Sequence, residues 1–310
     1  MAIIKLDDVS KLYGFGDATT LALDEVSLTI EQNEFVAVMG PSGCGKSTLM
    51  HIIGLLDRPT HGSFMLNERS VARLSQARRG KIRRDTIGFI FQSYNLLPRL
   101  TVLENVALPL AYRGVSLAKR TKLAINMLER VGLSDRDYFY PPQLSGGQVQ
   151  CVAIARALVN DPKLIIADEP TGNLDSTSSR LIMELLSEIH KSGNTILFVT
   201  HNPEPTRYAS RVVYMHDGSI IQDEQTKVGE VAETALQQMY TVPTRTAEDD
   251  LAGVSVLMKA LPQKESRASK VEPVKRGRRK AVGKSRSKVT RKPVKTSRSN
   301  HAAPKRGARK

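Results

Sequence analysis

Apolar and polar positions alternate along the first forty residues, a pattern typical of half-buried β-strands. We expect strands near residues 3–9, 26–30 and 35–39, because these runs are rich in Val, Ile, Leu and Phe. A glycine-rich segment follows the third strand directly, and residues 46–55 then continue with helical spacing. The N-terminal part is therefore predicted to be mainly β structure that leads into a strand–loop–helix unit.

Helical and strand periods alternate over the following residues. Residues 101–160 show mainly helical spacing, most clearly in 117–131 and 149–159. Short apolar runs that predict buried strands occur at 87–91, 164–167, 195–199 and 212–215. Asp217-Gly218 is a turn signal that closes a final hairpin. These elements predict an α/β fold with a mixed core sheet, an N-terminal antiparallel β part and a helical subdomain inserted at about 101–160.

The glycine-rich segment has the spacing of a phosphate-binding loop. Its residues are Gly40, Pro41, Ser42, Gly43, Cys44, Gly45, Lys46 and Ser47, followed by Thr48. The glycines let backbone N–H groups point inward at phosphates, and the start of the next helix adds partial positive charge. We expect Lys46 to reach the β- and γ-phosphates of ATP and the Ser47 hydroxyl to hold Mg²⁺. A chance glycine-rich turn is the simpler alternative, and Cys44 is expected to be a passive loop residue rather than a redox sensor.

Two adjacent carboxylates follow the apolar run at 164–167. Neighbouring side chains on a strand point to opposite faces, so Asp168 and Glu169 are expected to have different roles. We expect Asp168 to act on the metal side, through Mg²⁺-bound water, and Glu169 to be the general base that polarises the attacking water. Two solvated acids at a strand end are the alternative.

The segment Leu144-Ser145-Gly146-Gly147-Gln148 precedes an apolar-periodic helix and forms an anion-binding helix start. In isolation it would be an ordinary Ser-Gly helix cap. With the phosphate loop, the acidic strand end and a lone His201 after an apolar strand, it resembles ATP-binding cassette (ABC) ATPases over roughly residues 2–224. The resemblance implies that ATP lies between the phosphate loop of one protomer and Ser145, Gly146, Gly147 and Gln148 of the other. Two chains are then needed for two complete sites.

The resemblance also implies roles for residues outside these motifs. Tyr13 would stack on adenine, and Gln92 would contact Mg²⁺ and the attacking water. Asp175, in the segment Asn173-Leu174-Asp175, would couple the two protomers at the nucleotide, and His201 would contact the γ-phosphate. A surface aromatic for Tyr13 and a structural histidine for His201 are the alternatives.

Residues 57–60, 91–98 and 101–106 resemble the branch of this family that contains macrolide-exporter and lipoprotein-releasing ATPases. In that branch the ATPase drives a permease, which implies export or mechanical work across the envelope. Two positions depart from the family pattern. Asn33 stands where Gly is usual, and Asn tolerates the left-handed backbone best after Gly. Cys151 stands where Arg is usual, which affects the expected hydrolysis rate rather than nucleotide binding.

The formal net charge of +15, taken over the whole chain, is typical of a protein that binds nucleic acid or a membrane. The distribution of the charge along the chain changes this interpretation. Residues 263–310 hold 19 Lys+Arg and 2 Asp+Glu, whereas the rest of the chain holds 27 and 29. The basicity therefore belongs to a tail, which its composition predicts to be disordered. Three roles are open for this tail: it keeps the protein soluble, it contacts the anionic inner membrane surface, or it contacts nucleic-acid phosphates. Base stacking is not expected, because the tail has no aromatic residue.

We therefore expect an ATP-binding domain at 2–224, a short and partly helical extension at 225–262, and the tail at 263–310. The absence of a signal peptide, of an apolar run near ~20 residues and of a disulfide spacing predicts a cytoplasmic protein. The resemblance implies that it lies peripherally at the inner face of the plasma membrane. The expected partners are a membrane permease and a second ATP-binding subunit, a further copy of this chain.

Two other functions compete with that of a transporter ATPase. One is a soluble ABC ATPase acting on nucleic acid or ribosomes, and the other is an ATPase that gates an extracytoplasmic enzyme. The 99 residues from Lys46 to Ser145 leave no room for a long coiled coil, which argues against the first.

Overall fold

The computed structural model describes residues 1–14 and 19–229 of the 310-residue chain. All of them belong to one compact unit, Met1–Pro262, and the second unit, Gln263–Lys310, lies outside the described residues. The expected basic tail, and the expected extension beyond residue 229, are therefore outside them as well. Within the described ranges, no helix is long and apolar enough to cross a membrane.

Strands and helices alternate along the described ranges. The strands are β1 (Ala2–Tyr13), β2 (Thr20–Glu31), β3 (Phe35–Met39), β4 (His61–Leu66), β5 (Arg69–Ser70), β6 (Ile87–Ile90), β7 (Leu164–Asp168), β8 (Thr195–Thr200), β9 (Arg211–His216) and β10 (Ser219–Gln225). The α-helices are α1 (Lys46–Ile53), α2 (Gln76–Thr86), α3 (Val102–Tyr112), α4 (Leu117–Arg130), α5 (Gly146–Leu158) and α6 (Ser176–Lys191). Two short 3-10 helices are η1 (Pro141–Gln143) and η2 (Glu204–Tyr208).

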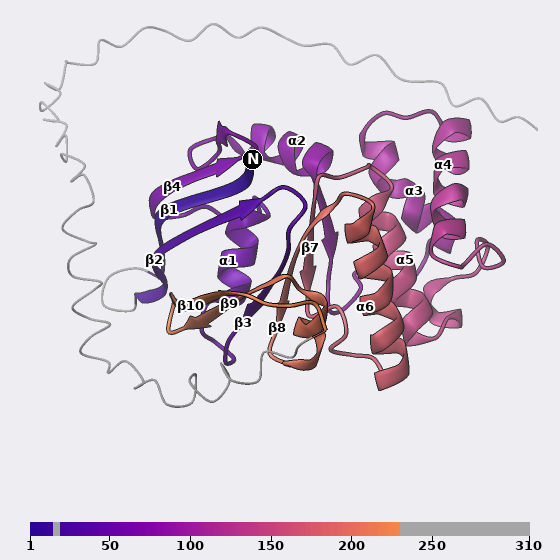
Figure 1. Ribbon diagram of the computed structural model, residues 1–310. Coiled ribbons are helices and arrows are strands. Elements are labelled where there is room, and N and C mark those ends of the chain that lie inside the picture. The colour runs from indigo at the N-terminus through magenta and orange to yellow at the C-terminus, as the bar shows by residue number, and fades with distance from the viewer. Residues whose placement is uncertain (15–18, 230–310) are drawn as a thin grey trace, which may run out of the picture. The chain divides into compact units, whose positions relative to one another are not determined.

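The core of the fold is a six-stranded sheet in the order β10-β9-β3-β8-β7-β6. Strands β9, β3, β8, β7 and β6 run parallel to their neighbours, and β10 pairs antiparallel with β9. A second, antiparallel sheet has the order β2-β1-β4-β5. Figure 1 shows this second sheet on the side of α1, with α5 and α6 on the other side of the six-stranded sheet. The predicted mixed core sheet and antiparallel β part are confirmed.

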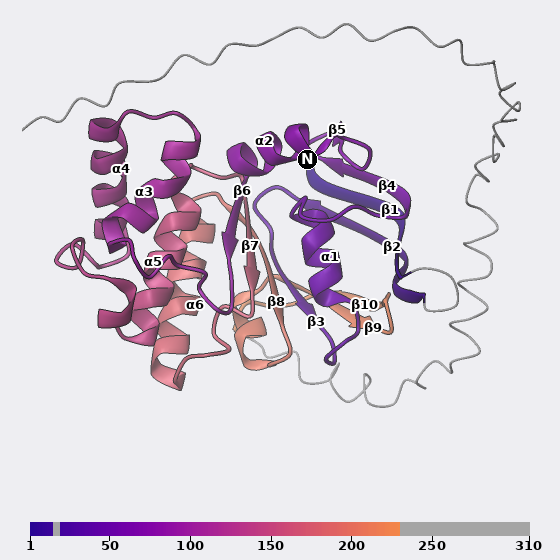
Figure 2. The same cartoon turned by 180° about the vertical axis from the view of Figure 1, so that it is seen from behind.

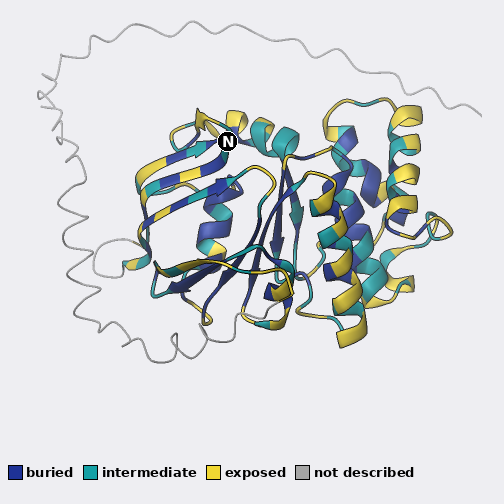
Figure 3. Cartoon of the chain, viewed as in Figure 1, coloured by how far each residue is buried: buried dark blue, intermediate teal, exposed yellow. Residues whose placement is uncertain are grey.

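Successive residues of the central strands face two different hydrophobic cores. In β3, Phe35, Ala37 and Met39 pack with apolar side chains of α3–α6, whereas Val36 and Val38 pack with those of α1 and the antiparallel sheet. All five residues are buried, which is the pattern of a parallel strand covered on both faces. Figure 3 shows the central strands of the six-stranded sheet, β3, β8 and β7, as mostly buried. Side chains packed on both faces of the sheet therefore fix the position of β3.

The helical content expected at 101–160 is present as α3, α4, η1 and α5, and Figure 2 shows the α-helices of this segment together at one side. The helix whose apolar spacing is clearest at 149–159 begins at Gly146, because Ser145 caps it as expected. One predicted helix limit is wrong. The helix expected to reach residue 55 ends at Ile53, because Gly54 follows and Leu55 takes a left-handed backbone with φ 57°.

Two strands, two α-helices and one 3-10 helix of the described residues were not predicted from the sequence: β4, β5, α2, α6 and η2. Helix α2 has almost no apolar face, and its arginines hold it in place instead. Arg79 donates to the backbone carbonyl of Asp57, and Arg83 donates to that of Leu55 at 2.8 Å. Helix α6, in contrast, buries Ile182, Met183, Leu186 and Ile189 at helical spacing, so its pattern was readable in the sequence.

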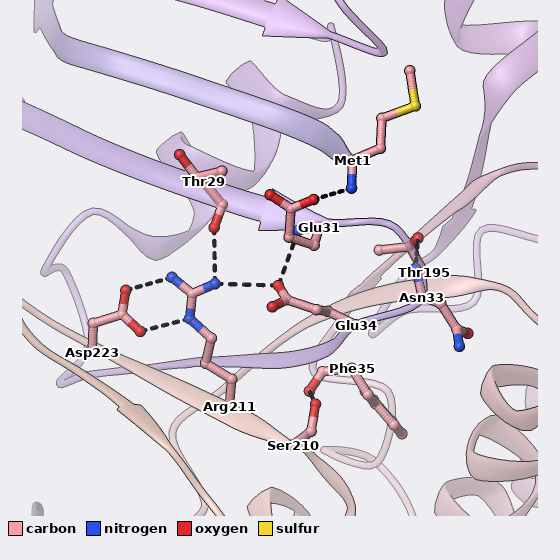
Figure 4. Close-up of polar contacts among 10 residues, drawn as sticks. All are labelled: Met1, Thr29, Glu31, Asn33, Glu34, Phe35, Thr195, Ser210, Arg211 and Asp223. Carbon is pink, nitrogen blue, oxygen red and sulfur yellow. Dashed lines mark hydrogen bonds and ion pairs between the residues drawn. The ribbon is translucent and has the colours of Figure 1, made fainter.

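The Arg211 side chain on β9 joins three segments of the chain (Figure 4). Its Nε and Nη2 atoms donate to the two carboxylate oxygens of Asp223 at 2.7 and 2.6 Å. Its Nη1 atom donates to Glu34 Oε2 at 3.2 Å and to the Thr29 carbonyl at 2.8 Å. The side chain is only 14% exposed, so one guanidinium connects β10, β2 and the start of β3 in a mostly buried position.

Replacing Arg211 with Met should lower the free energy of unfolding by about 2–3 kcal/mol, because Glu34 and Asp223 would remain near each other without their cation. Chemical denaturation measures this loss. Arg180→Met is the control, since its ion pair with Glu184 is largely exposed and should contribute at most about 0.5 kcal/mol. Equal losses for the two variants would contradict this role of Arg211.

Candidate functional site

Residues that follow four neighbouring parallel strands converge at one edge of the six-stranded sheet. The glycine-rich loop follows β3, Gln92 comes after β6, Glu169 follows β7 and His201 follows β8. The carboxyl ends of parallel strands meet at the same edge, which brings these distant segments together. A cavity of about 430 Å³ opens there, which we call the loop cavity. It is lined by Ala22, Ser42, Gly43, Gly45, Lys46, Ser47, Thr48, Asp168, Glu169, Val199 and His201.

Helix α1 begins at the loop cavity without any side-chain cap. Its N-cap is Gly45, no side chain accepts from the first N–H groups, and the first turn has no acidic residue. Gly45 has φ 102°, and a Cβ there would lie 2.6 Å from the Ala22 carbonyl oxygen. Glycine is therefore required at this position, and the free N–H groups of the helix start can bind an anion.

The Lys46 ammonium is buried against its own loop. Nζ donates to the carbonyl oxygens of Gly40 at 2.8 Å and Pro41 at 2.7 Å, and the residue is 7% exposed. These carbonyls hold a cation at the wall of the loop cavity. A ligand with anionic oxygens would be attracted to this cation and to the start of α1.

Strand alternation predicted that the two carboxylates at the end of β7 point to opposite faces of the sheet, and the structure differs from this. The strand ends at Asp168, and Glu169 takes a left-handed backbone with φ 41°. Both residues line the loop cavity, so they do not point to opposite faces of the sheet. The turn at Glu169, with its N–H donating to the Val199 carbonyl at 3.0 Å, overrides the alternation.

The Glu169 carboxylate is held between two other predicted site residues. His201 Nδ1 donates to Oε1 at 2.6 Å, and Gln92 Nε2 donates to Oε2 at 3.2 Å. Gly172 packs closely against this pair, since a Cβ there would lie 3.0 Å from Gln92 Nε2 and 3.1 Å from Glu169 Oε2. The three side chains form one hydrogen-bonded group at the wall of the loop cavity, a geometry that suits a positioned proton acceptor.

Ser47 and Asp168 both line the loop cavity and offer hard oxygen donors. Burial, and then the nearby charge of Glu169, raise the pKa of the Asp168 carboxyl. A divalent cation would offset this repulsion, so the donor set fits Mg²⁺. Among the described residues no cluster of three or more His, Cys, Asp or Glu could hold a metal ion. A magnesium ion here would therefore take further oxygens from its phosphate ligand and from water.

The residues at the start of α5 do not line the loop cavity of their own chain. Ser145 accepts from Gln148 N–H at 3.3 Å, and the Gln148 side chain accepts from Ser145 N–H at 3.0 Å, which forms a capping box. A Cβ on Gly146 would lie 3.3 Å from Leu174, and one on Gly147 would lie 3.1 Å from Ser178 Oγ. The start of α5 thus packs against the segment that leads into α6.

Asp175 is the N-cap of α6. Its carboxylate accepts from Ser178 N–H at 2.9 Å and from the Ser178 hydroxyl at 2.6 Å, and these bonds lower the pKa of Asp175. Asp175 is also absent from the lining of the loop cavity. Tyr13 lies outside that lining too, but its phenol interacts with Thr48, which belongs to it.

Two contacts that support the site were not predicted, one made by Gln150 and one by Asn173. Gln150 is fully buried in α5, and its Nε2 donates to the Pro170 carbonyl at 2.8 Å, directly after Glu169. Asn173 Nδ2 donates to the Gln92 carbonyl at 2.9 Å. A polar residue on the apolar face of a helix was the available signal for Gln150, whereas the contact of Asn173 with Gln92 has no local signal in the sequence.

The two cysteines are weak candidates for chemistry. Burial raises the pKa of the Cys44 thiol, and it raises that of Cys151 to about 11. Both thiols are therefore protonated at neutral pH, which makes them poor nucleophiles. The expectation for Asn33 is confirmed, since it has a left-handed backbone with φ 62° and its N–H donates to Thr195 Oγ1 at 2.9 Å.

The chain matches the family model described as ABC transporter over residues 23–172. It is 48% identical over 223 residues to an uncharacterized ABC transporter ATP-binding protein, YvrO, of Bacillus subtilis (strain 168), covering 72% of this chain and 97% of that protein. It is 49% identical over 238 residues to the macrolide export ATP-binding/permease protein MacB of Hyphomonas neptunium, covering 77% of this chain but 37% of MacB. The chain therefore spans just over a third of the length of that fused protein.

A solved structure has the same fold. It is described as the dimeric, post-hydrolysis state of the ATP-binding cassette MJ0796 bound to ADP and Pi. The TM-score is 0.68 at 44% sequence identity, and the match covers 72% of this chain and 99% of the other. A second structure of the same cassette, described as a dimeric bacterial ABC transporter cassette, matches equally well.

Proposed function

The chain belongs to the ABC transporter family and is an ATPase of that family, and from this premise we propose that it powers a separate membrane permease from the inner face of the plasma membrane. The observation that carries the proposal is the placement of Glu169 between Gln92 and His201, at the wall of the cavity that Lys46 also lines. This arrangement combines a phosphate-binding loop with a positioned base. The work done is export or mechanical work across the envelope.

In this proposal the phosphate loop binds the triphosphate of ATP. The backbone N–H groups of Gly40–Ser47 and the start of α1 receive the phosphates, with Thr48 at the loop's end and Tyr13 against adenine. Lys46 exchanges its bonds to the loop carbonyls for bonds to the β- and γ-phosphates. Ser47, Asp168 and Gln92 would hold Mg²⁺, whose charge would offset that developing on the phosphates.

Glu169 is the proposed general base for hydrolysis. Its carboxylate accepts a proton from the attacking water, and the bonds from His201 and Gln92 fix its orientation. In this proposal His201, which is hydrogen-bonded to Glu169, also contacts the γ-phosphate. Because Glu169 stands on a left-handed turn that is held by Val199 and Gln150, the base is placed by the end of the sheet rather than by a free loop.

The site is completed by a second copy of this chain. Ser145, Gly146, Gly147 and Gln148 cap α5 away from their own loop cavity, so they are proposed to meet the nucleotide bound by the partner. Asp175 lies in the segment against which these glycines pack, and it is proposed to couple the two protomers. ATP binding then closes two chains around two nucleotides, and hydrolysis releases them.

The residues at 263–310 carry the largest charge imbalance in the sequence, with 19 Lys+Arg against 2 Asp+Glu. We propose that they contact an anionic phosphate surface. The inner membrane surface suits a permease-bound ATPase, since each basic residue near such a surface contributes about 1 kcal/mol. Nucleic acid is the alternative partner, and it would accompany a soluble ATPase rather than a transporter.

The proposal is tested by purifying the tagged Glu169→Gln chain, with Mg-ATP, from detergent-solubilised cells. We expect a multi-pass membrane protein to co-purify in stoichiometric amount. Lys46→Ala, which cannot use ATP, is the matched control and should recover less of it. Ribosomes, RNA or DNA without a membrane protein would overturn the permease proposal and favour the nucleic-acid alternative.

A further inference from the structure

The Tyr13 ring at the end of β1 is held by a pair of charged side chains. Its phenol donates to Asp57 Oδ2 at 2.8 Å, and the Lys11 ammonium lies over one face of the ring, 4.7 Å from its centroid. Lys11 Nζ also meets Asp57 Oδ2 at 2.9 Å. Burial, and then the bond to Asp57, raise the pKa of Tyr13, so the phenol is a donor at neutral pH.

Asp57 is itself fixed to the loop that ends helix α1. Its N–H donates to the His51 carbonyl at 3.0 Å, its Oδ1 accepts from Arg58 N–H at 2.7 Å, and its carbonyl accepts from Arg79. Burial acts to raise the pKa of Asp57, but the bonds from Lys11 and Tyr13 outweigh it and keep the pKa below its ordinary value. The carboxylate is therefore a charged and well-anchored acceptor.

This group borders the loop cavity. Thr48 lines that cavity, and its side chain is near enough to the Tyr13 phenol to act on that group's pKa. Ala22, which lies on β2 between the partners of Lys11 and Leu12 on β1, lines the cavity too. The ring is 41% exposed. Since Lys11 covers one face of the ring, the other face is the one available to a planar ligand beside the phosphates.

We propose that Asp57 is a positioning residue for the nucleobase, which holds the Tyr13 ring so that its open face meets the base. This inference rests on the proposed binding of ATP at the loop cavity and names the residue that sets its base contact. Lys11 has two effects: it covers the far face of the ring, and it neutralises Asp57. A carboxylate without that cation would repel the phosphates bound nearby.

The position of Tyr13 in the fold explains why its ring needs a contact such as that with Asp57. Tyr13 is the last residue of β1. Its backbone is paired with Thr20 of β2, and the pairing of β1 with β4 ends before it. A side chain at a strand end can change rotamer unless another contact restrains it. Asp57 supplies that contact from the loop after α1, which is the helix that begins at the phosphate loop. The hydrogen bond to Asp57 therefore fixes the position of the Tyr13 ring relative to the phosphate loop.

The test compares a ligand that has a base with one that lacks it. Calorimetric titrations with Mg-ADP and with magnesium pyrophosphate are made on the wild-type chain, Asp57→Ala, Tyr13→Phe and the double variant. Each single change should weaken ADP about fivefold and leave pyrophosphate within about twofold. The double variant should be no weaker than either single one, because both remove the same bond. In the ATPase assay, KM should rise about fivefold with little change in kcat.

Three results would overturn the inference: unchanged ADP affinity in Tyr13→Phe, equal weakening of ADP and pyrophosphate by Asp57→Ala, or effects that multiply in the double variant. Tyr13→Phe removes only the hydroxyl that donates to Asp57, so its ADP affinity tests the inference even if Asp57→Ala does not fold. Lys46→Ala should lose both ligands. A wild-type chain that binds neither ligand would instead overturn the proposed function, and the inference with it.

Discussion

Replacing Glu169 with Gln should lower the rate of ATP hydrolysis by about a thousandfold and leave ATP binding intact. A positioned general base contributes roughly 10²- to 10⁴-fold to a rate, and the amide cannot accept the proton. The substituted side chain would keep a carbonyl as an acceptor for His201, whereas its amide nitrogen would face the Gln92 amide that now donates to Oε2 of Glu169. The variant therefore loses both the base and part of its orientation.

Because bound ATP is no longer consumed, the same variant should accumulate as a closed dimer. Size-exclusion chromatography with Mg-ATP measures the dimer, and phosphate release measures the rate. Glu204→Gln is the matched control, since Glu204 is a largely exposed carboxylate (73% exposed) that does not line the loop cavity. Adding Ser145→Arg to Glu169→Gln should return the chain to monomer while ATP still binds. Hydrolysis by Glu169→Gln at the wild-type rate would show that another group is the base.

Replacing Lys46 with Ala should weaken ATP binding by at least about 100-fold, which corresponds to about 2.7 kcal/mol. The change removes a buried ammonium that can make charge-assisted hydrogen bonds to two phosphates. It also leaves the Gly40 and Pro41 carbonyls without their present donor, which should let the loop change conformation. Hydrolysis should fall at least as far as binding.

Titration calorimetry with ATP measures the loss in Lys46→Ala, and thermal melting without ligand checks that the chain is folded. Lys191→Ala is the control, because Lys191 is an exposed lysine at the end of α6 and lies outside the loop cavity. Retention of wild-type affinity by Lys46→Ala would place the triphosphate somewhere other than the loop cavity.

Elements with a strong local period could be predicted from the sequence. The strand at Phe35–Met39 was predicted with its observed limits, and the apolar strands near β7, β8 and β9 were predicted to within a residue or so. A strand covered on both faces is a continuous apolar run, and this is visible without any partner. The amphipathic helix α6 has an equally clear local period, since its buried residues recur at helical spacing, although it was not predicted.

Helix α2 could not be predicted from the local pattern of apolar and polar residues. Its sequence is polar and rich in arginine, and Arg79 and Arg83 stabilise it through carbonyls near Asp57 and Leu55. Those acceptors are 22 and 28 positions earlier in the chain. No window of neighbouring residues contains both donor and acceptor, so periodicity could not predict this helix.

The sequence by itself determined the α/β class, the phosphate loop and the identity of most candidate site residues, because residue type, spacing and period are local properties. Only the tertiary structure decided how those residues meet. The left-handed turn at Glu169 placed both carboxylates at one cavity, and Gln92 reached Glu169 from 77 positions away. Asp57 reached Tyr13 from 44 positions away. Such contacts depend on the order of strands in the sheet, which is set by packing of the whole chain and not by any one segment.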